Sequence, residues 1–243
     1  MSWNSYIKGF KNYLQLEKSL SANTVEAYVR DISKFAGYLN AENLELNYDE
    51  IELKHLEGFV KTINEFGFDA RSQARMIAGI RAFYRYLLME DLISVNPTEL
   101  LSTPKLSRKL PDTLSVKEIN VLLDSIDVST PEGARNRAML EVLYGCGLRV
   151  SELTTLKISN LFLDVDFIKV IGKGDKERLV PIGSQAIKFI KLYKENVRVH
   201  VPIRKGHEDI LFLNRRGKGL TRMYVFLVIK ECAAKVGLGK TIS

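Results

Sequence analysis

This sequence contains few of the residues from which metal sites and disulfide networks are built. Its 243 residues include two cysteines and three histidines. Cys146 and Cys232 stand far apart with no CxxC or Cys/His spacing, so neither a disulfide framework nor a zinc site is indicated. His55, His200 and His207 are scattered, and no cluster of carboxylates suggests a Mg²⁺ site. We therefore predict no metal and expect both cysteines to be buried thiols.

Long apolar segments are also missing. No run of about 18 apolar residues is present, and the N-terminal residues do not have the basic and then apolar layout of a signal peptide. We expect a cytoplasmic protein with no membrane partner. Residues 239–241 resemble the end of a Walker A motif, but Ala234 stands where that motif requires glycine, and the preceding segment reads as helix. We predict no nucleotide and no other cofactor.

The positive charge is concentrated in one part of the chain. A hydrophobic content of 46% is typical of a soluble globular protein with a real core, and the formal net charge is +7. Residues 1–104 hold 11 Lys+Arg against 14 Asp+Glu, a balance of −3, whereas residues 105–243 hold 25 against 15, a balance of +10. The basic part is therefore the expected contact for a polyanion, and nucleic acid is favoured over an acidic membrane surface.

Apolar residues at helical spacing, with turn signals between the segments, predict a small domain of four helices over residues 1–100. Ser21 is a suitable N-cap for the second helix and Asp49 for the third. The domain is expected to end near Asn96 and Pro97. The predicted helices are Trp3–Leu16, Ser21–Leu39, Asp49–Glu65 and Ala70–Glu90.

Residues 101–111 form a polar, basic stretch with no helical or strand period, and we interpret them as a linker. A second domain is predicted over residues 112–243, where strand-forming segments flank a glycine-containing turn and indicate a β-hairpin. The predicted fold class is therefore α plus mixed α/β: a four-helix domain, then a mostly helical domain with a small antiparallel β-hairpin sheet. The elements expected in the second domain are helices starting at Ser115, Ser184 and Thr221, helices over Ala134–Tyr144 and Val150–Leu156, and strands over Leu161–Ile171, Arg178–Ile182 and Asp209–Leu213.

One face of the fourth predicted helix carries four arginines. When each residue advances by about 100° around the axis, they fall at about 0°, 40°, 280° and 320°, and no Asp or Glu lies on this stripe. Apolar residues centre on the opposite side, so the helix can bury one face and offer guanidinium groups to a phosphate backbone. A solvated helix face is the alternative, because arginine is a good helix former. The four residues are Arg71, Arg75, Arg81 and Arg85.

Arg149 follows a glycine that stops one helix and stands at the start of the next, where free amides and the helix dipole favour an anion. Its planar fork can bind two phosphate oxygens and stays protonated near neutral pH. Glu152 lies three positions further along the same face. This carboxylate could orient the guanidinium for a ligand, or the two residues could form a purely structural ion pair.

Lys173 stands between two glycines in the predicted hairpin turn, where its flexible side chain could carry an ammonium into a site built mainly by helices. Such a lysine could donate a proton to a leaving oxygen, although most lysines in hairpin turns are simply solvated. Lys176 and Arg178 of the same hairpin are further candidate DNA contacts. The basic clusters 204–207 and 215–218 are either additional phosphate contacts or solvated loops.

These segments together resemble a tyrosine recombinase of the phage integrase superfamily, close to the Xer type. The core-binding (SAM-like) domain of that family resembles residues 20–32, LSANTVEAYVRDI, and its catalytic domain resembles residues 147–153, GLRVSEL, and 172–182, GKGDKERLVPI. The matches follow the family's order and the resemblance covers the whole chain. The first domain begins almost at residue 1, which is similar to the minimal Xer layout rather than to the larger phage integrases.

The resemblance implies a site-specific DNA recombinase that cuts and rejoins strands through a phosphotyrosine intermediate. Arg149 is then the first catalytic arginine, which stabilises the five-coordinate transition state, Lys173 protonates the departing 5′ oxygen, and Glu152 supports them. The resemblance implies neither metal nor ATP, because the phosphotyrosine bond conserves the energy. It also implies two domains that clamp double-stranded DNA and a homo- or hetero-tetramer with a sister recombinase. Both chromosome dimer resolution and mobile-element integration fit this family.

The sequence departs from the family pattern near its C-terminus. The family's later histidines, second arginine and tyrosine nucleophile have no match before Ser243, and Tyr224, the last of ten tyrosines, does not occupy the nucleophile position. We therefore expect a truncated or incompletely represented recombinase that does not cleave DNA by the family mechanism. The alternative is a non-catalytic DNA-binding remnant or regulator that occupies recombination sites. An in-frame continuation after Ser243 bearing His, Arg and Tyr would favour the enzyme.

Overall fold

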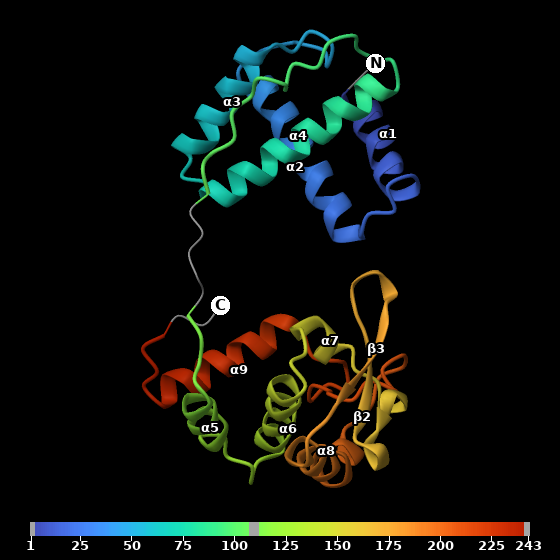
Figure 1. The fold of residues 1–243 in the computed structure, drawn as a ribbon, viewed down its shortest axis with the longest axis vertical. Helices are drawn as coiled ribbons and strands as arrows, with labels where there is room; N and C mark the ends of the chain where they lie inside the picture. Colours follow the sequence, from blue (N-terminus) through green and yellow to red (C-terminus); the bar gives the residue numbers. More distant parts are fainter. Residues whose placement is uncertain (1–2, 107–111, 241–243) are drawn as a thin grey trace. The chain divides into compact units, whose positions relative to one another are not determined.

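The helices and strands of this chain are gathered into two units, Met1–Lys109 and Leu110–Ser243. The structure is a computed structural model and describes residues 3–106 and 112–240 (Figure 1). Part of the predicted linker, residues 107–111, lies outside the described residues. Within the described parts of the chain, no helix is long and apolar enough to cross a membrane.

The described residues of the first unit, 3–106, form four helices, which confirms the predicted helical fold of this part. They are α1 (Trp3–Leu16), α2 (Ala22–Ala41), α3 (Leu53–Glu65) and α4 (Ala70–Met89). Ser21 is the N-cap position of α2 as expected, and the Asp69 carboxylate caps α4 by accepting a bond of 2.9 Å from the Ser72 amide. Because Asp69 satisfies one of the free amides of the first turn, α4 begins sharply.

The predicted start of the third helix at Asp49 is wrong. Helix α3 begins at Leu53, and its N-cap is Glu52, whose amide donates to His55 Nδ1 at 3.0 Å. The physical reason lies in Ile51, which is buried in the core of the unit just before the helix. An extended segment here lets Ile51 reach that core, which outweighs the capping preference of Asp49.

Helix α4 runs through the centre of the first unit. Its predicted apolar side, Met76, Ile80, Phe83 and Leu87, is at most 1% exposed. Trp3 of α1 stacks on Phe83 with ring centroids 6.0 Å apart, so aromatic packing joins the two helices.

The predicted linker starts too early, because Leu101 belongs to the core of the helical unit. Its side chain is 3% exposed and packs in the same cluster as the four helices. Arg81 of α4 also donates to the Leu101 carbonyl and, at 3.0 Å, to Thr103 Oγ1. The segment after α4 is therefore fastened to the helical unit at least as far as Thr103.

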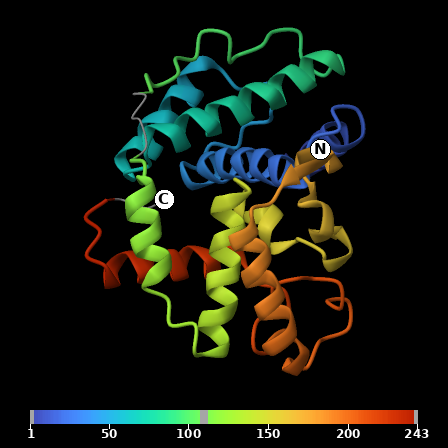
Figure 2. The same ribbon diagram turned by 60° about the horizontal axis from the view of Figure 1, so that its bottom comes forward.

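The second unit combines five α-helices of its described part with a small sheet. The capping box of Ser115 and Glu118 is present, with Ser115 N to Glu118 Oε2 at 2.7 Å and Glu118 N to Ser115 Oγ at 3.3 Å. Helices α6 and α8 lie side by side (Figure 2). The helices are α5 (Val116–Asp124), α6 (Pro131–Gly145), α7 (Val150–Thr154), α8 (Ser184–Asn196) and α9 (Arg222–Lys235), with short 3₁₀ turns η1 (Ile158–Asn160), η2 (Leu163–Val165), η3 (Lys173–Asp175) and η4 (Arg198–His200).

The sheet is antiparallel with the order β1-β2-β3, formed by β1 (Leu161–Phe162), β2 (Phe167–Ile171) and β3 (Glu177–Pro181). The single strand predicted over Leu161–Ile171 is therefore wrong: the chain reverses at Asp166, which has a left-handed φ of 58°. Asp tolerates this conformation better than the β-branched residues around it. The reversal turns one predicted strand into a hairpin and gives the sheet a third strand.

The strand predicted over Asp209–Leu213 is also wrong. Only isolated bridges, Lys157 with Ile210 and Leu213 with Gly219, occur in this segment. Its apolar residues Leu211, Phe212 and Leu213 are at most 1% exposed. The predicted strand is a buried connection instead, because a short apolar run does not distinguish the two.

Candidate phosphate-binding site

The turn between α6 and α7 positions the candidate catalytic arginine. Helix α6 ends at Gly145, and Gly147 takes a left-handed φ of 58°, a conformation that glycine adopts without the clash of a Cβ atom. Leu148 then turns inward and is 7% exposed. Arg149 follows as the N-cap residue of α7, so its guanidinium stands at the start of a helix.

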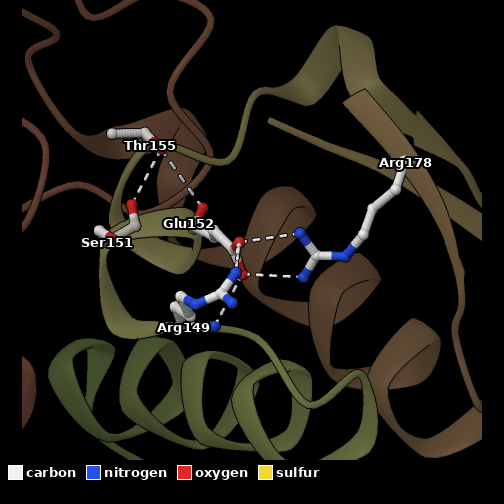
Figure 3. Close-up of polar contacts among 5 residues, drawn as sticks. All are labelled: Arg149, Ser151, Glu152, Thr155 and Arg178. Atoms are coloured by element: carbon white, nitrogen blue, oxygen red, sulfur yellow. Dashed lines mark hydrogen bonds and ion pairs between the residues drawn. The ribbon is translucent and has the colours of Figure 1, made fainter. Parts of the chain in front are cut away.

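Glu152 of α7 is the centre of the site (Figure 3). Its carboxylate accepts hydrogen bonds from the Arg149 amide at 2.8 Å and from Arg149 Nη1 at 2.9 Å. It also accepts from Arg178 of β3, with Nη1 to Oε1 at 2.8 Å and Nη2 to Oε2 at 2.9 Å. Two guanidinium groups from different elements therefore converge on one carboxylate.

Hydrogen bonds from the two arginines make this buried carboxylate a fixed negative charge, although burial alone would favour its neutral form. The Glu152 side chain is 2% exposed. The two hydrogen bonds from Arg178, reinforced by the Arg149 amide and guanidinium, lower the Glu152 pKa to about 2. Glu152 is therefore ionised at neutral pH, and the group of one carboxylate and two guanidinium groups carries a net positive charge.

Arg149 remains the accessible member of the group. Its side chain is 71% exposed, compared with 40% for Arg178. Within the described residues, the Arg149 guanidinium makes no hydrogen bond other than the one from Nη1 to Glu152. Its other nitrogens are thus free to bind the oxygens of an anion, as a planar fork does with phosphate.

The β2–β3 hairpin closes on the same carboxylate through Gly172. A Cβ atom on Gly172 would stand 3.4 Å from Glu152 Oε1 and 3.3 Å from Arg178 Nη1, so the backbone of the hairpin passes close to this ion pair. Lys173 follows directly as the first residue of the turn η3. The Gly172 amide donates to the Lys176 carbonyl at 2.8 Å and closes the loop. The structure therefore places residue 173 in the chain segment next to Glu152.

The arginines of the α4 stripe do not form one uniform surface. Arg71 and Arg85 are exposed, while Arg75 and Arg81 are only partly so. Arg75 is paired with the buried Asp31 carboxylate of α2, and Arg81 holds the segment after α4. The stripe itself carries no acid, as the sequence indicated, but a neighbouring helix supplies one. Part of the stripe therefore stabilises the fold.

The two basic loops lie beside each other in the second unit. The Arg204 amide donates to the Gly217 carbonyl at 3.0 Å, which joins cluster 204–207 to cluster 215–218. The cationic residues of these loops are exposed; they are Arg204, Lys205, Arg215, Arg216 and Lys218. No local pattern predicts this pairing, because it depends on a close approach of Gly217 to the chain at Pro202.

Arg178, which the sequence indicates as a candidate DNA contact, is bound to Glu152, and no local pattern predicts this bond. The two residues are 26 positions apart, and only the hairpin register, in which Val170 faces Arg178, brings them together. Tyr224 is engaged elsewhere: its hydroxyl accepts from Arg135, whose guanidinium also lies 4.9 Å from the ring centroid. Among the residues that the structure describes, no group of three His, Cys, Asp or Glu side chains could hold a metal ion.

Models of two protein families match this chain. The model described as "Phage integrase family" matches residues 112–243, and the model described as "Phage integrase, N-terminal SAM-like domain" matches residues 7–91. The chain is 40% identical over 240 residues to tyrosine recombinase XerD of Listeria innocua serovar 6a, covering 99% of this chain and 81% of that protein. It is 38% identical over 237 residues to XerD of Staphylococcus aureus strain N315, covering 98% of this chain and 80% of that protein.

Solved structures share the fold. The pre-cleavage complex of XerH site-specific recombinase bound to difH substrate superimposes with a TM-score of 0.75 at 22% identity, over 98% of this chain and 80% of that one. A lambda integrase tetramer bound to a Holliday junction gives a TM-score of 0.70 at 16% identity, over 100% of this chain and 68% of that one. At these sequence identities, the similarity to the two structures shows only that the folds are alike.

Proposed function

Because this chain belongs to the phage integrase family of tyrosine recombinases, we propose that it takes part in cutting and rejoining double-stranded DNA at specific sites. Strand exchange in this scheme passes through a phosphotyrosine bond, so no nucleotide is needed to conserve the energy of the broken strand. The XerD relatives make recombination of the Xer type the specific form of the proposal. We place this activity in the cytoplasm.

The observation that carries the proposal is the exposed guanidinium of Arg149 beside a buried, doubly held carboxylate. Glu152 fixes one nitrogen of Arg149 at 2.9 Å and leaves the others open. A scissile phosphate bound there would have its growing negative charge stabilised by a group whose orientation is set beforehand. The start of α7 adds amides and dipole in the same place, although this short helix alone would be a weak attraction.

Lys173 is the proposed proton donor to the departing 5′ oxygen. Support for this role comes from Gly172, the residue before it, whose backbone lies against Glu152. A lysine ammonium held near the leaving oxygen can act as a general acid by donating its proton in the transition state. Arg149 would then stabilise the negative charge of the transition state, and Lys173 would protonate the leaving oxygen in the same reaction.

We propose that duplex DNA is held by cations outside this centre. Arg71 and Arg85 of α4 and Lys176 of the hairpin are exposed and suited to phosphate contacts. Arg75 and Arg81 would contribute less to binding, because they are already engaged within the helical unit. By analogy with the DNA-bound neighbours, the working form would be a tetramer, either of this chain or with a sister recombinase.

A suicide-substrate experiment tests this function. Duplexes bound by the purified protein are selected from random DNA, nicked near the centre of the selected site, and incubated with the product of the whole reading frame. A covalent protein–DNA adduct that resists denaturation is the expected result. The matched control is Arg137→Ala, an arginine of α6 that pairs with Asp124 and Glu141 instead of with Glu152.

Each outcome separates the alternatives. An adduct that disappears with Arg149→Ala and persists with Arg137→Ala supports the proposal. Site-specific binding without an adduct, in the whole product, would favour a DNA-binding protein that occupies recombination sites without cutting them. An adduct that survives Arg149→Ala at full rate would contradict the role given to Arg149.

A further inference from the structure

The two guanidinium groups that bind Glu152 make different numbers of hydrogen bonds to it, and Arg149 adds one more bond through its backbone amide. Arg178 binds both oxygens with parallel bonds of 2.8 and 2.9 Å, whereas the Arg149 guanidinium binds one oxygen at 2.9 Å. A bidentate pair of guanidinium and carboxylate is both stronger and more directional than a single bond. Of the two guanidinium groups, that of Arg178 therefore holds the carboxylate more firmly.

Arg178 also changes the net charge of the group that it forms with Glu152 and Arg149. Glu152 with Arg149 alone would be a neutral pair, and a neutral pair attracts a phosphate weakly. With Arg178 added, the group of three has a net charge of +1, and the buried carboxylate is compensated by a residue other than Arg149. Since charge interactions near a protein surface are still several times stronger than in bulk water, this difference matters for an incoming anion.

The hairpin backbone fixes Arg178 in this role. The register Val170 to Arg178 sets the position of the arginine on β3. Gly172 approaches so closely that a Cβ atom would stand 3.3 Å from Arg178 Nη1 and 3.4 Å from Glu152 Oε1. The ion pair is thus held between α7 and the hairpin, and it links the segment that carries Lys173 to the helix that presents Arg149.

We propose that Arg178 is a positioning residue: it neutralises and orients Glu152, and thereby leaves Arg149 with its full charge and a free edge for a phosphate. The inference rests on the proposed function, since it takes Arg149 as the group that binds the phosphate. Arg178 itself need not touch the DNA. This differs from a direct DNA contact, in which Arg178 would add its own bond to the ligand.

The test follows the side-chain Nε–Hε signal of Arg149 in the ¹⁵N-labelled chain while inorganic phosphate is added. We expect Arg178→Met to weaken the phosphate affinity by about tenfold or more, because Glu152 then neutralises Arg149. Arg178→Lys keeps the charge but loses the bidentate fork, so its affinity falls in between. The double variant Arg178→Met with Glu152→Gln returns to within about threefold of the unaltered chain, because the opposing charge is gone.

Rescue by the double variant is the decisive readout. If Arg178 were merely structural, or touched the phosphate directly, adding Glu152→Gln would not restore affinity, and that result overturns the proposal. The matched control is Lys169→Met, which removes another cation of the same sheet, one that pairs with Glu177 at 3.3 Å. A loss from Lys169→Met as large as that from Arg178→Met would also overturn it, because any cation of the hairpin would then suffice.

The same titration keeps this inference separate from the proposed function. If Arg149 in the unaltered chain responds to neither phosphate nor a DNA duplex, the proposed function fails. If Arg149 responds and Arg178→Met changes nothing, only the role of Arg178 fails. Should Arg178→Met not fold, Arg178→Gln, which can still donate one bond to Glu152, replaces it with the same expected loss and rescue.

Discussion

Asp31 and Arg75 form an ion pair in which the acid is completely buried and the base is partly exposed. The Asp31 side chain is 0% exposed and that of Arg75 is 38% exposed. Asp31 Oδ2 accepts from Arg75, while Oδ1 has no hydrogen-bond partner in the described part of the chain. Gly79 makes room for this carboxylate, since a Cβ atom there would stand 3.2 Å from the Asp31 Cβ. Arg75, which the sequence predicts to contact DNA, therefore compensates the buried charge of Asp31.

The asymmetry of this pair predicts unequal effects of its two substitutions. Arg75→Met should lower the free energy of unfolding by about 3–5 kcal/mol, because it leaves a buried carboxylate without its cation. Asp31→Asn should lower it by only about 1–2 kcal/mol, because Arg75 can turn to solvent and the buried group is then neutral. Urea unfolding of both variants measures the difference. A larger loss from Asp31→Asn would show that Arg75, not Asp31, is the group that needs its partner.

The low pKa of Glu152 predicts a loss of stability in acid. The pKa falls from its ordinary value of 4.5 to about 2 in the folded protein, with Arg178 as the largest cause. Because the folded pKa is the lower one, the stabilisation is fully present above about pH 4.5 and disappears as the pH falls toward 2. Its size is about 3 kcal/mol, from about 1.36 kcal/mol per pKa unit. Unfolding of the unaltered chain and of Glu152→Gln between pH 2 and 7 should show a difference in slope over this window; parallel curves would exclude it.

Because Arg149 is proposed to serve the chemistry and other cations to hold the DNA, its substitution should affect cleavage much more than DNA affinity. Arg149→Ala should change DNA affinity by less than about threefold while it slows formation of the covalent adduct by about a hundredfold or more, the usual effect of losing one group that stabilises transition-state charge. Binding is measured by fluorescence anisotropy and adduct formation by gel. A loss of affinity as large as the loss of rate would place Arg149 among the ordinary DNA contacts.

The exposed arginines of α4 predict a change in salt dependence. Replacing Arg71 and Arg85 by alanine should weaken binding at every sequence and reduce the slope of log K against log salt by about 2, close to 0.9 per lost phosphate contact. Lys8→Ala with Lys11→Ala, two exposed cations of α1, is the matched control. If both pairs flatten the slope equally, the effect comes from the charge of the unit and not from a DNA-facing helix.

Local patterns in the sequence determined much of this protein. The sequence predicts the helix Trp3–Leu16 to the residue, the apolar face of α4, and the start of a helix at Ser115. All three depend on neighbours within one or two turns, where the interactions that decide the structure lie three or four residues apart. The GLRVSEL segment likewise indicated Arg149 and Glu152, because both sit on one short helix.

The tertiary structure decided what depended on distant partners. Ile51 entering the core displaced the start expected at Asp49, and the reversal at Asp166 divided a strand that looked continuous. The partner of Arg75 stands 44 positions away and that of Arg178 stands 26 positions away, so no local period could reveal either pair. The sequence by itself determined which residues are the candidates for the chemistry. Only the folded chain decided which arginines compensate buried carboxylates and which remain free, because burial and pairing arise when separate elements pack together.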